Sequence, residues 1–98
     1  MIQTSPIIIH PDGTTEALVY TPPQDEEDFQ ELQASLQILQ NAVGGYIEIV
    51  ALPTDDSLIL LVNEDGLRLE LPHNPQASAL AQRPIVGNAI LLPKALLC

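Results

Sequence analysis

The feature that most constrains this chain is one amphipathic segment that ends at a pair of glycines. Across residues 25–43, apolar side chains recur at spacings of three and four, which is typical of one face of a helix. Asp25 or the acids directly after it are suited to cap the first amides, where the helix dipole also favours negative charge. Gly44 and Gly45 then provide a left-handed stop, and Tyr46 begins a strand. A helix that turns directly into a strand predicts an α+β fold.

Short β-branched or alternating runs, bounded by turn residues, predict the strands around this helix. They are residues 7–9, 15–20, 46–51, 57–62, 67–71 and 85–92, with a short helix at 76–82. We expect a mainly antiparallel sheet of about five to six strands in the order ββ-α-βββ-short helix-β, with the long helix on one face and no helix on the other. The expected core consists of Leu32, Leu36, Leu39, Ile47, Ile49, Leu58, Leu60, Leu69 and Ile85.

Length and charge limit the classes of function. The chain has 98 residues, which predicts a single domain over residues 1–98. Thirteen acids face three bases, for a formal charge of −10. Nucleic-acid and anionic-membrane binders need clustered Lys and Arg, so we expect neither activity. Cys98 is the only cysteine, and the first residues lack the pattern of a signal peptide, so we expect a cytoplasmic protein.

Residues of catalytic type occur without the context that catalysis needs. His10 and His73 each lie beside a proline turn and far apart in sequence, which does not predict a metal site. The paired acids at 55–56 and 64–65 fall in turns, where carboxylates bond to the backbone and to water. The order at Gly44 is helix, glycine, strand, the reverse of a phosphate-binding loop. We therefore expect no enzyme activity, no metal and no cofactor.

One set of polar residues is a candidate binding surface. Tyr46, Glu48, Arg68 and Glu70 alternate along two strands of an expected three-stranded meander, so they are expected on one exposed face of the sheet. His73 and Asn74 are expected to complete this surface. The simpler interpretation is a cross-strand ion pair, worth about 0.2–1 kcal/mol.

Four segments resemble the family called domain of unknown function 3846. They are residues 43–48 (VGGYIE), 63–66 (NEDG), 71–74 (LPHN) and 84–89 (PIVGNA), and their order and spacing agree over about residues 6–92. Family members often carry more lysine after the second of these segments, where this chain has Leu67 and Arg68. The resemblance implies a small protein of bacteria, phages or mobile elements, and it implies no activity.

Two functions of different classes remain open. The first is a non-enzymatic interaction module of phage or mobile-element type, whose acidic surface binds a basic protein, such as a host nucleic-acid-binding protein. The second is a protein that binds or sequesters a small molecule, such as a nucleotide signal, at a subunit interface. Its polar contacts are expected from Arg68, Arg83, His73 and Asn74. Exposed sheet edges and a helix-free face also favour a homodimer.

Overall fold

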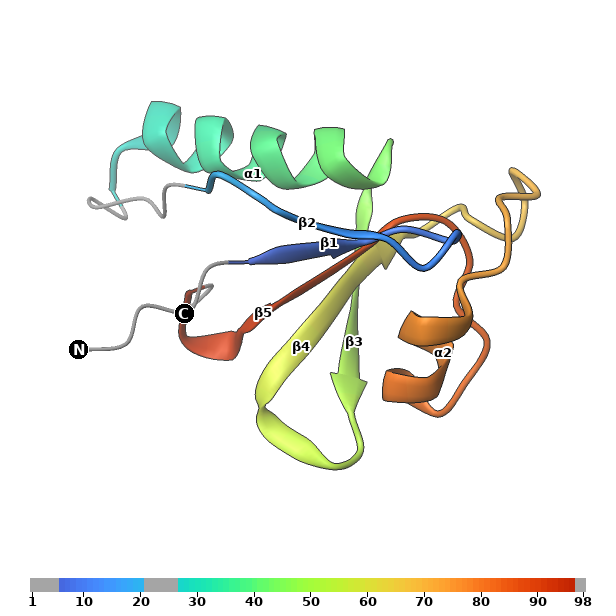
Figure 1. Ribbon diagram of the computed structural model, residues 1–98. Helices are drawn as coiled ribbons and strands as arrows, with labels where there is room; N and C mark the ends of the chain where they lie inside the picture. Colours follow the sequence, from blue (N-terminus) through green and yellow to red (C-terminus); the bar gives the residue numbers. More distant parts are fainter. Residues whose placement is uncertain (1–5, 21–26, 97–98) are drawn as a thin grey trace.

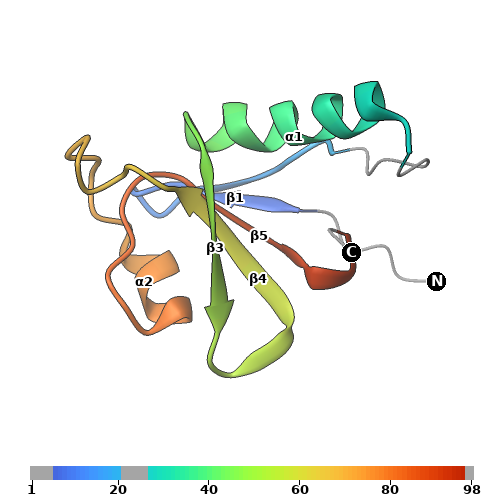
Figure 2. The ribbon, with the colours of Figure 1, turned by 180° about the vertical axis from the view of Figure 1, so that it is seen from behind.

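The computed structural model describes residues 6–20 and 27–96, and it places one antiparallel sheet between two helices (Figure 1, Figure 2). The sheet has five strands in the order β2-β1-β5-β4-β3, so the last strand along the chain lies in the middle. The α+β class and the long helix on one face of the sheet are confirmed. The elements in chain order are β1 (Ile7–Ile9), β2 (Thr15–Ala17), α1 (Phe29–Val43), β3 (Ile47–Leu52), β4 (Asp55–Asn63), α2 (Pro75–Ala81), β5 (Ala89–Pro93) and the 3-10 turn η1 (Lys94–Leu96).

The long helix α1 begins and ends at residues whose side-chain chemistry determines those positions. Its N-cap is Asp28, whose side chain accepts hydrogen bonds from the amides of Gln30 at 3.0 Å and Glu31 at 3.3 Å. At the other end Gly44 has φ 81°, and its amide donates to the carbonyl of Gln40 at 2.8 Å. The predicted stop is confirmed. The helix begins at Phe29 rather than at residue 25, and residues 21–26 lie outside the described part of the chain.

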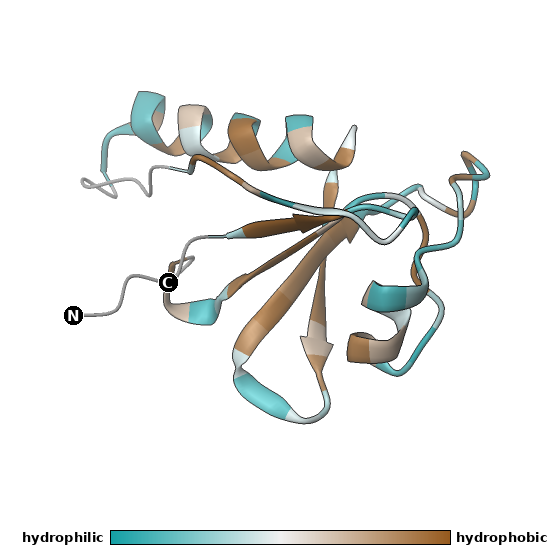
Figure 3. Ribbon diagram, viewed as in Figure 1, coloured by the Kyte–Doolittle hydropathy of each residue, from teal (hydrophilic) through white to brown (hydrophobic). Residues whose placement is uncertain are grey.

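Within α1, the buried side chains begin at Ser35, after the first two turns. Leu39 and Val43 are buried against one sheet face, in a cluster with Ile8, Ile59, Leu61, Ile90 and Leu92. Figure 3 shows the apolar strands lying beneath this helix. Phe29, Leu32 and Leu36 remain exposed, so the expected core positions of Leu32 and Leu36 are wrong. The helical period was correct, but the sheet does not extend under the whole apolar stripe.

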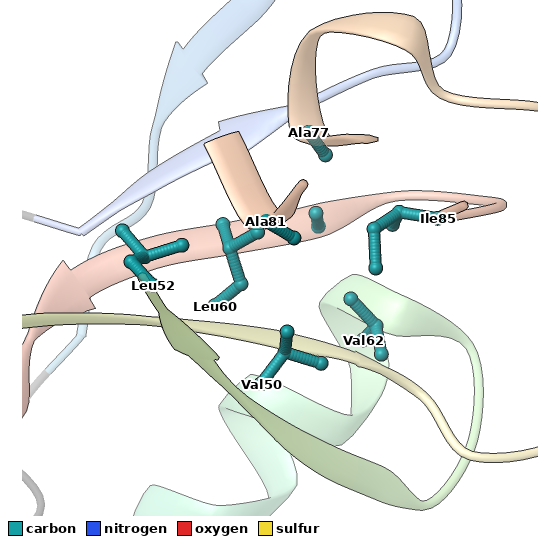
Figure 4. Packing of buried hydrophobic residues seen from close by; sticks show 8 residues of the cluster. Val50, Leu52, Leu60, Val62, Ala77, Ala81 and Ile85 are labelled. Atoms are coloured by element: carbon teal, nitrogen blue, oxygen red, sulfur yellow. The ribbon is translucent and has the colours of Figure 1, made fainter. Parts of the chain in front are cut away.

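The second helix covers the opposite face of the sheet, so the expectation of a helix-free face is wrong. Small side chains of α2, Ala77 and Ala81, approach β3, β4 and the segment before β5 closely. They pack with Val50, Leu52, Leu60, Val62, Ile85 and Ala89 (Figure 4). The predicted start of this helix is confirmed, because Asn74 is its N-cap and Pro75 its first residue.

The prediction of a strand over residues 67–71 is also wrong. These residues belong to a run of turns that follows β4, at the right of Figure 1. The strand that pairs with β4 on the side away from β3 is β5. The position beside β4 is covered by helices on both faces. A strand there must be apolar on both sides, as β5 is, and Arg68 and Glu70 would each bury an unpaired charge.

The remaining core expectations are confirmed in part. Leu39, Leu60 and Ile85 are buried, as expected, whereas Ile49 and Leu69 are exposed. Ile47 and Leu58 are partly buried against the two clusters. Residues 85–88, expected in the last strand, instead form a loop in which Gly87 has φ 74° and donates to the carbonyl of Pro72 at 2.7 Å. Neither of the two described helices is long and apolar enough to cross a bilayer.

Candidate functional site

A pocket of about 290 Å³ lies where the ends of β3 and β4 meet the loop before β5. Its charged lining residues come from three separate parts of the chain: Glu48 from β3, the turns after β4, and Arg83 from the segment after α2. The full lining is Glu48, Val62, Asn63, Glu64, Asp65, Gly66, Leu67, Arg68, Arg83, Pro84, Ile85 and Val86. We call this the acidic pocket, because carboxylates outnumber cations in it.

Residues 64–70 form an ordered helical turn, of which residues 64–68 line the acidic pocket. The buried Asn63 side chain accepts a hydrogen bond from the amide of Asp65 at 2.8 Å and donates to the carbonyl of Val43 at 3.1 Å. The turn ends with bonds from Leu71 N–H to the carbonyl of Gly66 and from Glu70 N–H to the carbonyl of Leu67, both at 3.1 Å. With Glu70 at φ 56°, this pattern is a Schellman motif.

Close packing holds this turn against the rest of the domain. A Cβ atom added at Gly66 would come within 2.8 Å of a methyl group of Val86, and one added at Gly87 within 2.7 Å of Leu71. The turn therefore presents a preformed surface. On this surface two apolar side chains point away from the core. Leu67 is 78% exposed and Leu69 is 49% exposed.

Both arginines of the acidic pocket are already paired with carboxylates that line it. Arg68 Nη2 lies 3.2 Å from Asp65 Oδ2, and Arg83 Nη2 lies 3.2 Å from Glu48 Oε2. Glu64 adds a further negative charge. The pocket is therefore net negative even though it contains two of the three basic residues of the chain.

A second, shallower hollow of about 470 Å³ lies at the C-terminal end of α1. It is lined by uncharged residues: Gln37, Gln40, Asn41, Gly44, Gly45 and Tyr46. Within it, Gln37 Nε2 donates to Asn41 Oδ1 at 2.8 Å. The absence of charge distinguishes this hollow from the acidic pocket.

The structure brings together only part of the predicted binding surface. Glu48 and Arg68 line the acidic pocket, but Glu48 pairs with Arg83 rather than with the expected neighbours. Tyr46 lines the second hollow instead. The shared sheet face on which these residues were expected does not exist, because Arg68 and Glu70 belong to the turn after β4.

The two residues that were expected to complete the surface have structural contacts. His73 Nε2 lies 3.2 Å from Ser78 Oγ, within the first turns of α2. Asn74 is completely buried, and its side chain bonds to the backbone of Ile9, Ala77 and Gly87. Asn74 is therefore not accessible to a ligand.

A polar network at His10 was not recognised from the sequence. His10 Nε2 lies 2.7 Å from Glu16 Oε1, and His10 Nδ1 lies 3.0 Å from Asn88 Oδ1. The Asn88 amide group donates to the carbonyl of Ala42 at 3.1 Å, so its oxygen faces the imidazole. Both ring nitrogens therefore face acceptors, which favours the imidazolium form. The hydrogen bond to Glu16 is the main cause that raises the pKa of His10. The sequence did contain a signal for this network, because a hairpin turn after His10 brings Glu16 back beside it.

Two carboxylates accept hydrogen bonds from the residue two positions on, as the sequence predicted for Asp55. Asp12 accepts from the amide and hydroxyl of Thr14, and Asp55 from those of Ser57. These bonds hold the pKa of each carboxyl below its ordinary value. Across residues 6–20 and 27–96, no three His, Cys, Asp or Glu side chains are grouped to hold a metal ion. Cys98 lies outside the described residues.

Comparison with known proteins adds one finding. No curated protein and no solved structure matches the chain. One family model, described as domain of unknown function (DUF3846), matches residues 15–95, which include the acidic pocket and every described helix. The match agrees with the four segments that pointed to this family. The chain belongs to the DUF3846 family.

Proposed function

We propose that this protein is a non-enzymatic interaction module that binds a basic protein partner at the acidic pocket. The observation that carries the proposal is the pairing of Arg68 and Arg83 with carboxylates of the same pocket. Both cations are locally neutralised, and the chain as a whole has a charge of −10. Such a surface attracts Lys and Arg side chains and accelerates their approach.

The exposed leucines add an apolar contact to this charge. Leu67 and Leu69 stand on the ordered turn beside Glu64, Asp65 and Glu70. Interfaces commonly combine a central apolar contact with a polar rim. The complementary partner segment therefore carries an apolar side chain flanked by Lys or Arg. Because the turn is already ordered, little conformational entropy is lost on binding.

Nucleic-acid-binding proteins display surfaces of this basic type. A phage or mobile-element protein that occupies such a surface would compete with the nucleic acid for it. We therefore include a host nucleic-acid-binding protein among the proposed partners. The acidity of the chain supports this part of the proposal, together with the phage and mobile-element setting that the family resemblance implies.

The test uses a fluorescent peptide of alternating Lys and Leu, with binding measured by anisotropy. Wild-type protein should bind it, and Leu67→Ala should weaken binding by about fivefold to thirtyfold, the effect of losing 1–2 kcal/mol. Glu64→Gln should weaken it further at low salt. Val19→Ala is the matched control, because Val19 is also a strongly exposed apolar residue but does not line the pocket.

Two results would contradict this proposal. Binding that is undiminished at about 1 M salt excludes an electrostatic interface, because the Debye length there is only about 3 Å. Equal affinities for the Leu67→Ala, Val19→Ala and wild-type proteins exclude the ordered turn as the contact surface.

A second candidate function is binding of a small anionic molecule such as a nucleotide. The observation that favours it is that two of the three basic residues of the chain, Arg68 and Arg83, line one pocket. An anion must displace Asp65 and Glu48 from them, which lowers its affinity. Thermal unfolding with a panel of nucleotides tests this candidate. A rise in Tm that Arg83→Gln abolishes would support it, and no rise with any nucleotide would exclude it.

A further inference from the structure

The strand β3 forms one edge of the sheet, and its outer backbone groups can be identified from the register. The amide of Glu64 donates to the carbonyl of Tyr46 at 2.9 Å, which makes this pair hydrogen-bonded. In an antiparallel ladder hydrogen-bonded and non-bonded pairs alternate. The residues of β3 that bond to β4 are therefore Glu48 and Val50, opposite Val62 and Leu60. The N–H and C=O groups of Ile47, Ile49 and Ala51 point away from the sheet.

From Ile47 to Ala51 this edge lacks the usual features that prevent strand pairing. Edge strands are commonly protected by Lys, by Pro or by being very short. The opposite edge, β2, has three residues, whereas β3 has six and contains neither Lys nor Pro. Ile49, in the middle of β3, is 62% exposed. The single charge on β3, Glu48, is already paired with Arg83.

We propose that β3 pairs with β3 of a second copy of this chain, antiparallel and about a two-fold axis at Ile49. In this register Ile49 lies opposite Ile49 of the second copy, and Ile47 lies opposite Ala51. These pairs exchange N–H···O bonds through the groups that point outward. Glu48 lies opposite Val50, so no like charges are directly opposed. The two sheets become one continuous sheet.

A second copy fits this edge because the two-fold register brings the exposed Ile49 against itself and opposes no like charges. An isologous interface requires such a match between identical surfaces. A register irregularity between Ala51 and Leu52 ends the regular part of the strand, which limits pairing to the segment centred on Ile49. The acidic pocket is not consumed by this contact, since its remaining lining comes from the turns after β4 and from residues 83–86.

Electrostatics gives this dimer a characteristic salt dependence. Two copies with a charge of −10 each repel one another, and salt screens that repulsion. Dimerisation should therefore become at least about tenfold tighter between about 0.01 M and 1 M salt, as the Debye length falls from about 30 Å to 3 Å. Binding of a basic partner weakens over the same range. The opposite salt dependences therefore separate the two proposals in one experiment.

The test is analytical ultracentrifugation of the wild-type protein and of two variants at position 49, over a range of concentrations and salt. Ile49→Pro removes the outward N–H without removing a bond to β4, because proline is tolerated where the amide faces solvent. It should be monomeric where the wild type dimerises. Ile49→Thr is the matched control, because it keeps the outward amide and the β-branched shape, and it should retain the dimer.

Hydrogen exchange provides a readout that does not require the proline variant to fold. The amides of Ile47, Ile49 and Ala51 should exchange rapidly in dilute wild-type protein and slowly in concentrated protein at high salt. A wild type that stays monomeric at all concentrations and salts would overturn the proposal. So would a dimer in which these amides remain unprotected, or one that a folded Ile49→Pro variant retains, because that dimer uses another surface.

Discussion

Replacing Asn74 tests how much of the stability depends on one buried polar side chain. Its Nδ2 group donates to the carbonyls of Ile9 and Gly87, both at 2.9 Å, and its Oδ1 accepts from the amide of Ala77 at 3.1 Å. It thereby joins the first strand, the loop before the last strand and the start of α2. The side chain is completely buried, so water cannot replace it in these bonds.

The cost of Asn74→Ala follows from these three bonds. Each contributes about 1 kcal/mol net, and the vacated volume adds to the loss, so we expect a destabilisation of about 3–4 kcal/mol. A domain of this size has a total stability of about 5–15 kcal/mol. The substitution should therefore remove a large part of the free energy of unfolding and lower the urea midpoint accordingly.

Two further variants separate the contribution of the helix cap from that of the two bonds that Asn74 Nδ2 donates. Asn74→Asp keeps the acceptor for Ala77 but places a carboxylate oxygen against two carbonyls, so it should be as unstable as Asn74→Ala at neutral pH. It should recover partly in acid, where a neutral carboxyl donates one bond. Asp28→Ala removes the exposed cap of α1 and should cost only about 1 kcal/mol.

The measurement is urea unfolding followed by circular dichroism. A loss below about 1 kcal/mol for Asn74→Ala would refute the importance of the buried bonds. An Asn74→Asp protein as stable as the wild type would show that only the helix cap matters.

The remaining predictions concern the pH dependence and the backbone. Because the pKa of His10 is raised in the folded protein, its stabilisation is complete below the ordinary value of 6.5 and is lost as the pH rises through the folded-state value. Urea unfolding at a series of pH values should show this loss, and Glu16→Gln should flatten the profile. Glu70→Gly should stabilise the protein by about 0.5–1 kcal/mol, because glycine accepts φ 56° without strain; an unchanged or lower urea midpoint would contradict this. Gly87→Ala should destabilise it by about 1–3 kcal/mol, since φ is 74° and the new methyl group meets Leu71 at 2.7 Å; a Tm equal to that of the wild type would count against it.

The local part of the fold could be predicted from the sequence because it depends on neighbours along the chain. The apolar period, the acids before Phe29 and the glycine at position 44 were sufficient to predict a helix that ends there and continues into a strand. The same holds for the start of α2, where Asn74 caps and Pro75 is compatible with the first helical position. Capping and backbone preference act over a few residues, so they can be recognised in an isolated sequence.

The candidate site could be predicted only in part. Glu48, Arg68 and Arg83 were identified as polar residues of interest, but their arrangement depended on residues 67–71, which alternate like a strand and fold as a turn. Two predictions were made for Asn74: that it caps α2, which is confirmed, and that it lies on the surface, which is wrong. Its burial depends on Ile9, which is distant in sequence.

The helix that stops at Gly44 and the strand that follows were therefore determined by the sequence alone. The tertiary structure decided which strand lies beside β4. A position covered on both faces accepts Ala89 on the α2 side and Ile90 and Leu92 on the α1 side, all almost fully buried. It excludes Arg68 and Glu70. The cost of burying an unpaired charge exceeds the modest preference of an alternating segment for extended backbone. That balance depends on where both helices lie, and it leaves residues 64–70 as a turn whose first five residues line the acidic pocket.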